Sequence, residues 1–352
     1  MKQDHPFAKL MAQASTLTRR GSLLEATQAI QRALHLKRPQ PPAPAEAPDS
    51  VIVLDGLVRE IDSPPSRADA PPQPARFEEL PFASAQGLRQ YKLFTPAGLA
   101  DDKPAPLVLM LHGCKQNPDD FAAGTRMNEL AQAQGFRVLY PAQATRSNAQ
   151  RCWNWFQPGD QKRGGGEPAL LAGITRHVMQ THAVDAGRVY VAGLSAGGAM
   201  AAILAHEYPD LFAAAGVHSG LPVGSAHDVG SAFAAMKNGP RPAVAGALPA
   251  SPTPLIVFHG DHDVTVHPRN SELLLAGGVP SEVSSGVAEG GHGYVRSRFH
   301  DADGRLVAEH WLVQGSGHAW SGGSSAGSYT DPQGPDASRE MLRFFGERRL
   351  RR

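Results

Sequence analysis

Residues 188–200 read RVYVAGLSAGGAM, and this stretch decides which fold the sequence predicts. An apolar run leads into the pentad GLSAG at 193–197, and small residues that suit a helix follow it. A serine in a strained turn between a strand and a helix exposes its hydroxyl group, and small neighbours let the two elements pack closely. The helix also points its N-terminus at the reacting centre. We therefore predict that Ser195 is a nucleophile rather than a structural turn residue.

A second Gly-x-Ser-x-Gly pattern occurs at residues 323–327, so the pentad alone does not identify a nucleophile. The chain has 37 glycines among its 352 residues, so the bare pattern arises easily by chance and is weak evidence. No apolar run precedes Ser325, and no helical pattern follows it. We expect a flexible loop there, because only Ser195 has the strand and helix context that an exposed nucleophile needs.

Short apolar runs alternate with helical patterns from residue 87 to residue 349. The runs expected to be strands are 89–96, 107–111, 136–140, 189–192, 213–217, 255–258 and 309–313. The helical patterns lie at 126–134, 167–181, 196–206 and 336–349. This alternation indicates an α/β fold, with a mostly parallel central sheet and helices on both faces. Functional residues of such sheets gather where the strands reach their carboxyl ends.

The first 86 residues differ from this pattern. Apolar side chains at helical spacing on both sides of Gly21 predict an N-terminal helical hairpin at residues 1–36. One hairpin cannot bury its own apolar face, so we expect it to dock on the main domain or to form a homo-oligomer with a second copy. Residues 37–86 form a Pro/Ala-rich linker, interrupted by an apolar island at 51–58 that is either a strand or an anchoring segment. The catalytic domain is then expected at 87–349.

Charge and hydropathy argue against some partners. The chain carries 34 basic and 33 acidic residues, a formal net charge of +1, so nothing electrostatic favours nucleic acid or an anionic membrane. No apolar run reaches the roughly 18 residues of a membrane span. Residues 18–24 faintly resemble a twin-arginine export signal, but polar and charged residues follow where a signal peptide has its apolar segment. The localisation stays open between export and the cytoplasm.

A serine nucleophile needs a base, and the base needs an acid that orients it. In folds of this kind the chain order is serine, acid, histidine. The apolar run at 255–258 leads into GDHD at 260–263, which offers Asp261 and Asp263 as the acid. We favour Asp263, because Asp261 lies within the tight turn that follows Gly260.

The histidine should follow the last strand of the sheet. The run at 309–313 is followed by GSGHAW, in which two glycines before His318 allow the loop to swing the imidazole ring toward the serine. His292 is the rival, but it precedes that strand and is expected to be a loop residue. The tetrahedral intermediate also needs two backbone N–H donors. Ala196, just after the nucleophile, provides one, and the loop after an early strand provides the other at Cys114.

Five motifs carry a resemblance to a known family. They are HGCKQN at 112–117, CWNWF at 152–156, GLSAGGAM at 193–200, GDHD at 260–263 and GSGHAWSGG at 315–323. Together they resemble the polyhydroxybutyrate (PHB) depolymerase family of esterases, which is related to carbohydrate feruloyl and acetylxylan esterases. The resemblance covers about residues 75–348. It implies an α/β-hydrolase fold, the triad Ser195, Asp263 and His318, an acyl-enzyme intermediate and no cofactor.

The resemblance also implies a substrate class. Poly- or oligo(3-hydroxyalkanoate) esters are the first expectation, and a feruloyl or acetylxylan type of esterase, or another polyester hydrolase, is the alternative. An extracellular or periplasmic location would fit the family, although the sequence has no clear signal peptide. An additional polymer-binding domain is not evident either, and both departures argue against crystalline polymer as the substrate.

Family members often pair the cysteines that correspond to Cys114 and Cys152. The resemblance therefore implies a disulfide bond between two loops: the oxyanion loop, which contains HGCKQN at 112–117, and the CWNWF loop at 152–156. Two buried free thiols are the alternative.

Aromatic residues and long loops flank the expected site. We expect the rings of Trp153, Trp155 and Trp320 to wall a substrate groove, with ordinary packing as the alternative. The segment 157–167 could shape the rim of that groove. The long and irregular segment 221–254 could be a lid or a binding surface.

Two other functional classes are weighed against the esterase. His259, His262 and their neighbouring aspartates offer nitrogen and oxygen ligands that would suit a metal-dependent hydrolase. Adjacent residues of a turn point in different directions, however, and no distant cluster completes the shell, so we expect no metal. A binding protein without catalysis is disfavoured, because the sequence holds every member of the triad.

Overall fold

The computed structural model describes residues 73–240, 251–275 and 278–350. The expected N-terminal hairpin, the apolar island and most of the linker lie outside these residues. Residues 241–250, within the expected lid segment, also lie outside them.

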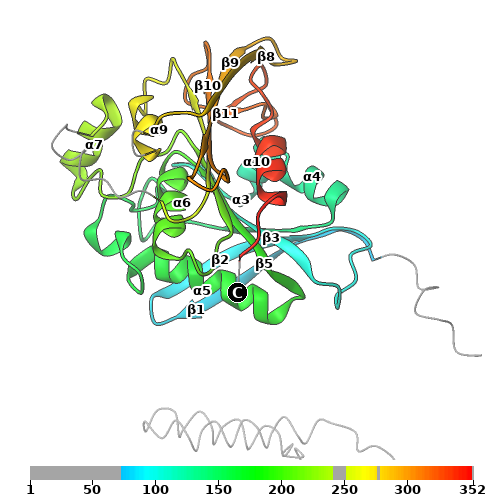
Figure 1. Cartoon of the computed structure of the whole chain (residues 1–352). Helices are drawn as coiled ribbons and strands as arrows, with labels where there is room; N and C mark the ends of the chain where they lie inside the picture. The colour runs from blue at the N-terminus through cyan, green and yellow to red at the C-terminus, as the bar shows by residue number, and fades with distance from the viewer. Residues whose placement is uncertain (1–72, 241–250, 276–277, 351–352) are drawn as a thin grey trace, which may run out of the picture. The chain divides into compact units, whose positions relative to one another are not determined.

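A ten-stranded sheet crosses the described part of the chain (Figure 1). Its strands are β1 (Arg76–Ser84), β2 (Gly87–Thr95), β3 (Ala105–Leu111), β4 (Arg137–Pro141), β5 (Val184–Leu194), β6 (Ala214–His218), β7 (Leu255–Gly260), β8 (Glu282–Val287), β9 (Gly293–His300) and β10 (Leu306–Val313). Their order in space is β1-β2-β4-β3-β5-β6-β7-β10-β9-β8. Neighbours from β4 to β10 in this order pair in parallel, and the pairs at both ends of the sheet are antiparallel. The central sheet is thus mostly parallel, as the sequence predicts.

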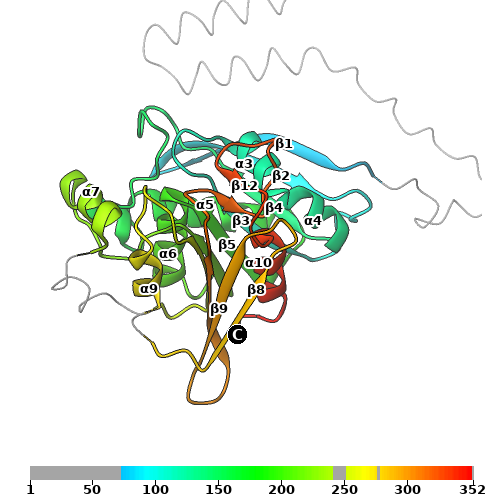
Figure 2. The ribbon, with the colours of Figure 1, turned by 90° about the horizontal axis from the view of Figure 1, so that it is seen from above.

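Helices cover both faces of this sheet. They are α3 (Pro118–Thr125), α4 (Met127–Gln134), α5 (Gly166–Thr181), α6 (Ala196–Glu207), α7 (Val229–Asn238), α9 (Arg269–Leu274) and α10 (Ala337–Gly346). The apolar side chains of α5 and α6 belong to one core, and those of α3, α4 and α10 belong to a second. Figure 2 shows α6 and α9 on one side of the strands, with α4 and α10 on the other.

Strand β3 shows why the central strands are apolar at every position. Leu107, Leu109 and Leu111 pack into the core that α5 and α6 cover, whereas Val108 and Met110 pack into the opposite core. Successive side chains of a strand point to opposite faces, so a strand covered on both sides must bury all of them. The continuous apolar runs of the sequence reflect this double burial.

Helix α6 lies between the sheet and its neighbours with every residue from Ala196 to Ala205 buried. A helix that is apolar on all sides must be buried on all sides. Helix α6 begins directly after β5, so the position of Ser195 is set by two of the most completely buried elements of the protein.

The start of the catalytic domain differs from the sequence-based expectation. Strand β1 lies within the range 37–86 that we assigned to the linker, and it pairs with β2 from Arg76 to Ser84. Several of its side chains are exposed, so β1 has no continuous apolar run in the sequence. Phe77 nevertheless packs edge-on against Phe94 and Tyr140. The linker therefore ends before β1, not at residue 86.

The segment 221–254 is more regular than expected, because it contains α7. The side chain of Asp228 accepts a hydrogen bond from the backbone N–H of Ser231 at 2.7 Å, and the Ser231 hydroxyl accepts one from the Asp228 N–H at 3.0 Å. This capping box satisfies N–H groups that the first turn of a helix leaves free. None of the helices in the described ranges is both long and apolar enough to cross a membrane.

Candidate active site

Ser195 occupies a strained turn between β5 and α6. Its backbone has φ 59° and ψ −120°, a region that residues other than glycine rarely adopt. A Cβ atom on Gly193 would come within 2.3 Å of the Gly197 carbonyl oxygen, and one on Gly197 within 2.0 Å of the Leu111 carbonyl oxygen. Only glycine fits at both positions, so the pentad brings β3, β5 and α6 together closely enough to hold the turn.

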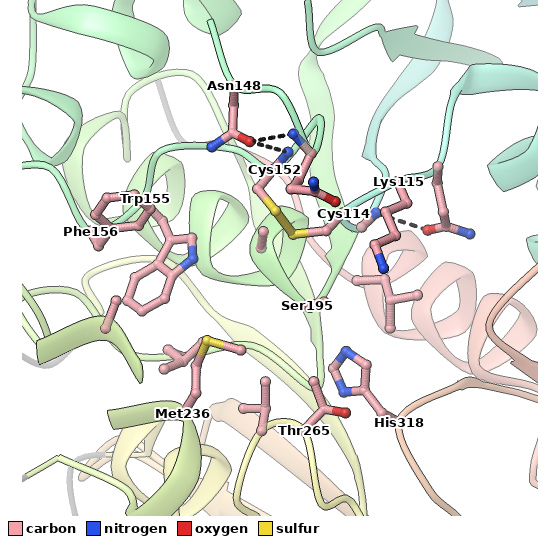
Figure 3. A pocket seen from close by; sticks show the side chains of 18 of the residues that line it. Cys114, Lys115, Asn148, Cys152, Trp155, Phe156, Ser195, Met236, Thr265 and His318 are labelled. Carbon is pink, nitrogen blue, oxygen red and sulfur yellow. Dashed lines mark hydrogen bonds between the residues drawn. A yellow bond between two sulfur atoms is a disulfide. The ribbon is translucent and has the colours of Figure 1, made fainter. Parts of the chain in front are cut away.

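His318 and Asp263 meet at the same edge of the sheet. Asp263 follows β7 and His318 follows β10, and these strands are parallel neighbours. The Nδ1 atom of His318 lies 2.7 Å from Oδ2 of Asp263. Ser195 and His318 line one pocket, and Figure 3 shows the imidazole ring beside the serine in that view. The geometry thus brings together all three residues that the sequence nominates.

Asp263 is held as a carboxylate. Its Oδ1 accepts hydrogen bonds from the backbone N–H groups of Thr265 at 2.9 Å and Val266 at 2.8 Å. The Nε2 atom of His259 lies 3.4 Å from Oδ2. Burial alone would raise the pKa of Asp263, but the hydrogen bonds from His259, His318 and Val266 outweigh it and hold the pKa well below its usual range. Asp263 is therefore ionised at neutral pH and can orient and stabilise a histidine cation.

The two rivals of the triad residues have other partners. Asp261 accepts a hydrogen bond from the backbone N–H of Gly315 at 2.7 Å, so it braces the loop that leads to His318. The Nε2 atom of His292 lies 3.3 Å from Oδ2 of Asp331. Ser325, the serine of the second pentad, lies in the loop between β11 (Trp320–Ser321) and β12 (Thr330–Asp331).

The oxyanion loop approaches the serine through Gly113. A Cβ atom at this glycine would lie 3.6 Å from the Cβ atom of Ser195. The next backbone N–H, that of Cys114, has no hydrogen-bond acceptor in the described part of the chain. Ala196 is the first residue of α6, so its N–H has no helical acceptor either. Both predicted donors are thus free to bind a developing oxyanion.

His112 fixes the beginning of this loop. Its Nδ1 atom lies 2.7 Å from the Gly113 carbonyl oxygen, and its Nε2 atom accepts a hydrogen bond from the Gln143 backbone N–H at 3.1 Å. Burial lowers the pKa of His112 to about 4, so the ring is neutral and keeps one donor and one acceptor nitrogen. The sequence motif includes His112 but does not reveal this bracing role.

A buried polar network holds the CWNWF loop through hydrogen bonds to its backbone. Sequence patterns do not identify this network. The side-chain NH2 group of Gln143 donates to the Cys152 carbonyl oxygen at 2.8 Å and also to the Glu167 carboxylate. Glu167 accepts from the Asn154 backbone N–H at 2.7 Å, and the guanidinium of Arg89 donates to the Gln143 side chain. Burial raises the pKa of Glu167. Glu167 is therefore a loop support and not the groove rim we expected from the segment 157–167.

A disulfide bond joins Cys114 to Cys152 and ties the two loops together (Figure 3). We expect the Cys114→Ser, Cys152→Ser double variant to lose about 4 kcal/mol of unfolding free energy, because the bond closes a loop with a sequence separation of 38. Denaturant unfolding of both proteins, with and without a thiol reductant, measures this. The reductant should destabilise only the wild type, and equal stability in all four samples would show that the bond contributes nothing.

A pocket of about 740 Å³ opens beside Ser195. One side of it is apolar and is lined by Trp155, Phe156, Leu221, Ala232, Met236 and Val266. Leu221, Ala232 and Met236 belong to the segment 221–254, which therefore contributes to the pocket wall. Another part of the lining is polar and comes from Lys115, Asn148 and Gln150. The pocket is amphipathic, so it suits a ligand with an apolar body and a polar end.

Only one of the three expected tryptophans lines this pocket, namely Trp155. Trp153 is completely buried, and its indole N–H donates to the His112 carbonyl oxygen at 3.0 Å. Trp320 is also buried, and its N–H donates to the Ser338 hydroxyl at 3.0 Å. The expectation that these two rings wall a groove is wrong, because both rings pack in the hydrophobic cores, where each indole N–H also has a hydrogen-bond acceptor.

The residues considered for a metal site diverge. His259 points its Nε2 atom at the Val266 carbonyl oxygen, 2.7 Å away, and Asp261 is engaged by the Gly315 N–H. Within the described ranges, no group of three or more His, Cys, Asp or Glu side chains is arranged to hold a metal ion.

Comparison with known proteins places the chain in a family. Residues 89–292 match the family model described as esterase PHB depolymerase. The chain belongs to this family. It is 33% identical over 252 residues to Poly(3-hydroxyalkanoate) depolymerase C of Paucimonas lemoignei, a match that covers 67% of this chain and 60% of that protein. It is 30% identical over 203 residues to Feruloyl esterase B of Thermothelomyces thermophilus, covering 53% of this chain and 68% of that one.

A solved structure agrees with the fold of this PHB depolymerase family member. The acetyl xylan esterase from Aspergillus awamori superposes with a TM-score of 0.61, covering 77% of this chain and 99% of that chain at 18% sequence identity. Such an identity speaks for the fold alone. Together with the mostly parallel sheet and the turn at Ser195, it confirms the predicted α/β-hydrolase fold.

Proposed function

We propose that the protein is a serine esterase that hydrolyses carboxylic esters through Ser195, His318 and Asp263. The observation that carries this proposal is the bond of 2.7 Å between His318 and Asp263, at the pocket that contains the strained Ser195. The family membership and the names of the relatives support the same chemistry. Esters of oligomeric or polymeric 3-hydroxyalkanoic acids are the substrates that we favour.

In the proposed first half-reaction, the Oγ atom of Ser195 attacks the ester carbonyl carbon and its proton passes to Nε2 of His318. Asp263 keeps the Nδ1–H of His318 directed away from the serine and stabilises the histidine cation. The N–H groups of Cys114 and Ala196 bind the oxyanion. When the intermediate collapses, His318 protonates the departing alcohol, and an acyl group stays on Ser195.

In the second half-reaction, His318 takes a proton from a water molecule, which attacks the acyl-enzyme. The acid then leaves, and Ser195 recovers its proton. No step requires a metal ion or an organic cofactor. The apolar wall of the pocket, including Trp155 and Met236, would hold the acyl chain.

A feruloyl or acetylxylan type of esterase is the second candidate. Feruloyl esterase B and a probable acetylxylan esterase A are 30% identical to this chain over 203 and 194 residues. A panel of 3-hydroxybutyrate oligomers, polymer film, feruloyl esters, acetylated sugars and aryl esters would rank the two candidates by kcat/KM.

An organophosphate probe tests the mechanism independently of the substrate. We expect the probe to abolish hydrolysis of a short aryl ester and to phosphorylate Ser195 with loss of its leaving group, so that the peptide containing Ser195 gains the mass of the phosphoryl group. EDTA should leave the rate unchanged. A loss of activity with EDTA, together with resistance to the probe, would instead favour a metal-dependent hydrolase.

A further inference from the structure

Lys115 and Gln150 are among the polar residues that line the pocket and that the proposed mechanism does not use. Lys115 follows the oxyanion donor Cys114 directly, and Gln150 lies in the loop that the disulfide ties to it. Both side chains line the pocket and are exposed. Within the described ranges, neither the Lys115 ammonium nor the Gln150 amide has a hydrogen-bond or ion-pair partner. Within that part of the chain they are unpaired donors, and they line the same pocket as Ser195.

A backbone hydrogen bond joins these two residues. The N–H of Lys115 donates to the Gln150 carbonyl oxygen at 2.7 Å. The carbonyl oxygen of Lys115 accepts from the Arg151 guanidinium, also at 2.7 Å. Lys115 itself has φ 67°, a left-handed conformation that needs such support. In Figure 3 its side chain extends toward the side of the pocket where Ser195 and His318 lie.

The positive charges of Lys115 and Arg151 are not paired with negative charges of the residues that the structure describes. Arg151 also forms no ion pair with a described residue, so two cations on neighbouring loops lack an anion. Some surface arginines have carboxylate partners, as Arg163 has in Asp210 at 2.7 Å and Arg126 in Glu129 at 2.9 Å. A net positive field at the mouth of a pocket attracts anionic ligands and repels cationic ones.

We infer that Lys115 and Gln150 form a subsite for the carboxylate of an acidic ester. This inference rests on the proposed function and names a class of substrate for it, namely short oligomers of hydroxy acids with an ionised chain end. In such an oligomer the carboxyl terminus lies on the alcohol side of every ester bond. The carboxylate bound by Lys115 therefore leaves with the alcohol product, while the acyl part stays on Ser195 against the apolar wall.

The same subsite explains how the enzyme would distinguish oligomers from a polymer surface. An ester bond in the interior of a polymer is flanked by neutral groups, so no carboxylate lies close enough to bind Lys115. An ester bond near a carboxyl terminus, in contrast, has a carboxylate close to it, and the Lys115 ammonium and the Gln150 amide line the same pocket as donors for its oxygens. Short acidic oligomers should consequently be better substrates than their neutral esters.

The test compares the 3-hydroxybutyrate dimer as the free acid with the same dimer as its methyl ester. For wild type and for Lys115→Met, the measured quantity is the ratio of kcat/KM for the acid to kcat/KM for the methyl ester. We expect this ratio to fall by about tenfold in Lys115→Met, the usual value of a hydrogen bond to a charged group. The fall should come from KM, and Lys115→Arg should keep most of the wild-type ratio.

Lys103→Met is the matched control. It removes the same charge from a lysine just before β3, whereas Lys115 lies after the end of that strand. Its ratio should equal that of the wild type. Lysine and methionine are both unbranched at Cβ, so the left-handed backbone is equally strained in Lys115→Met, and equal melting temperatures would verify this. About 1 M salt should lower the wild-type ratio, since it reduces the Debye length to about 3 Å.

The inference is overturned if Lys115→Met keeps the wild-type ratio, or if Lys103→Met lowers it as much. Either result leaves the proposed function intact as long as the wild type cleaves both dimers. The proposed function fails separately, when the organophosphate probe neither labels Ser195 nor inhibits the enzyme.

Discussion

Ser195→Ala is expected to lower kcat by about 10⁶-fold, the loss seen when such a nucleophile is removed from a complete triad. The hydroxyl group forms the covalent bond to the acyl group, and no other side chain at this turn can replace it. Alanine retains the Cβ atom that already occupies the strained position at φ 59°, so the fold should be unaffected. The measurement is kcat on a soluble aryl ester, with circular dichroism and the melting temperature as checks on folding.

Ser325→Ala is the matched control for this variant, since it makes the same chemical change in the second Gly-x-Ser-x-Gly pattern. That serine lies in a loop between two short strands and should leave kcat unchanged. If Ser195→Ala retained even a tenth of the wild-type activity while correctly folded, Ser195 would not be the nucleophile.

The central part of the fold could be predicted because its elements are buried on both sides. The expected strand at 107–111 corresponds to β3, and the expected helix at 196–206 to α6. At such positions burial leaves only apolar residues, and the sequence shows them as unbroken runs. The periodic signal disappears where an element is exposed.

Strands β1 and β8 illustrate that limit. The residues of β8 are almost all exposed, and among the described strands it pairs with β9 alone. Its pairing depends on contacts with a strand later in the chain, which no local pattern records. The same holds for β1, whose partner β2 determines that it is a strand and not a part of the linker.

The candidate site could be nominated from the sequence because chain order and strand context restrict its residues strongly. Asp263 and His318 are 55 residues apart, yet each follows a strand at the same edge of the sheet. Trp153 and Trp320 show that such reasoning does not predict the direction in which a side chain points. They are next to site residues in sequence, but the direction of each side chain depends on polar partners, such as Ser338, that only the fold brings near.

The buried network that supports the CWNWF loop was beyond sequence reasoning for a similar reason. Arg89, Gln143 and Glu167 come from three separate segments of the chain and have no common motif. Each is a polar residue that would be expected on the surface, and each is buried with a hydrogen bond or an ion pair to the other two. Sequence patterns identify apolar burial, whereas mutual satisfaction of polar groups requires coordinates.

Asp263→Asn is the second variant with a large expected effect, a loss of about 10⁴-fold in kcat. The carboxylate accepts the Nδ1–H of His318 and so leaves Nε2 unprotonated to receive the serine proton. An asparagine at this position can present its NH2 group to Nδ1, which favours the tautomer with the proton on Nε2. That tautomer cannot act as the base. The measurement is kcat on the same aryl ester used for Ser195→Ala.

Asp261→Asn separates this role from a general effect of charge. Asp261 is two residues away, and it accepts the Gly315 N–H at 2.7 Å and does not contact His318. The amide oxygen of asparagine can accept the same bond, so kcat should change by less than about tenfold, the scale of one weakened hydrogen bond. If Asp261→Asn lost more activity than Asp263→Asn, the acid of the triad would have to be reassigned. The bond of 2.7 Å between His318 and Asp263 would then describe only how a loop is held.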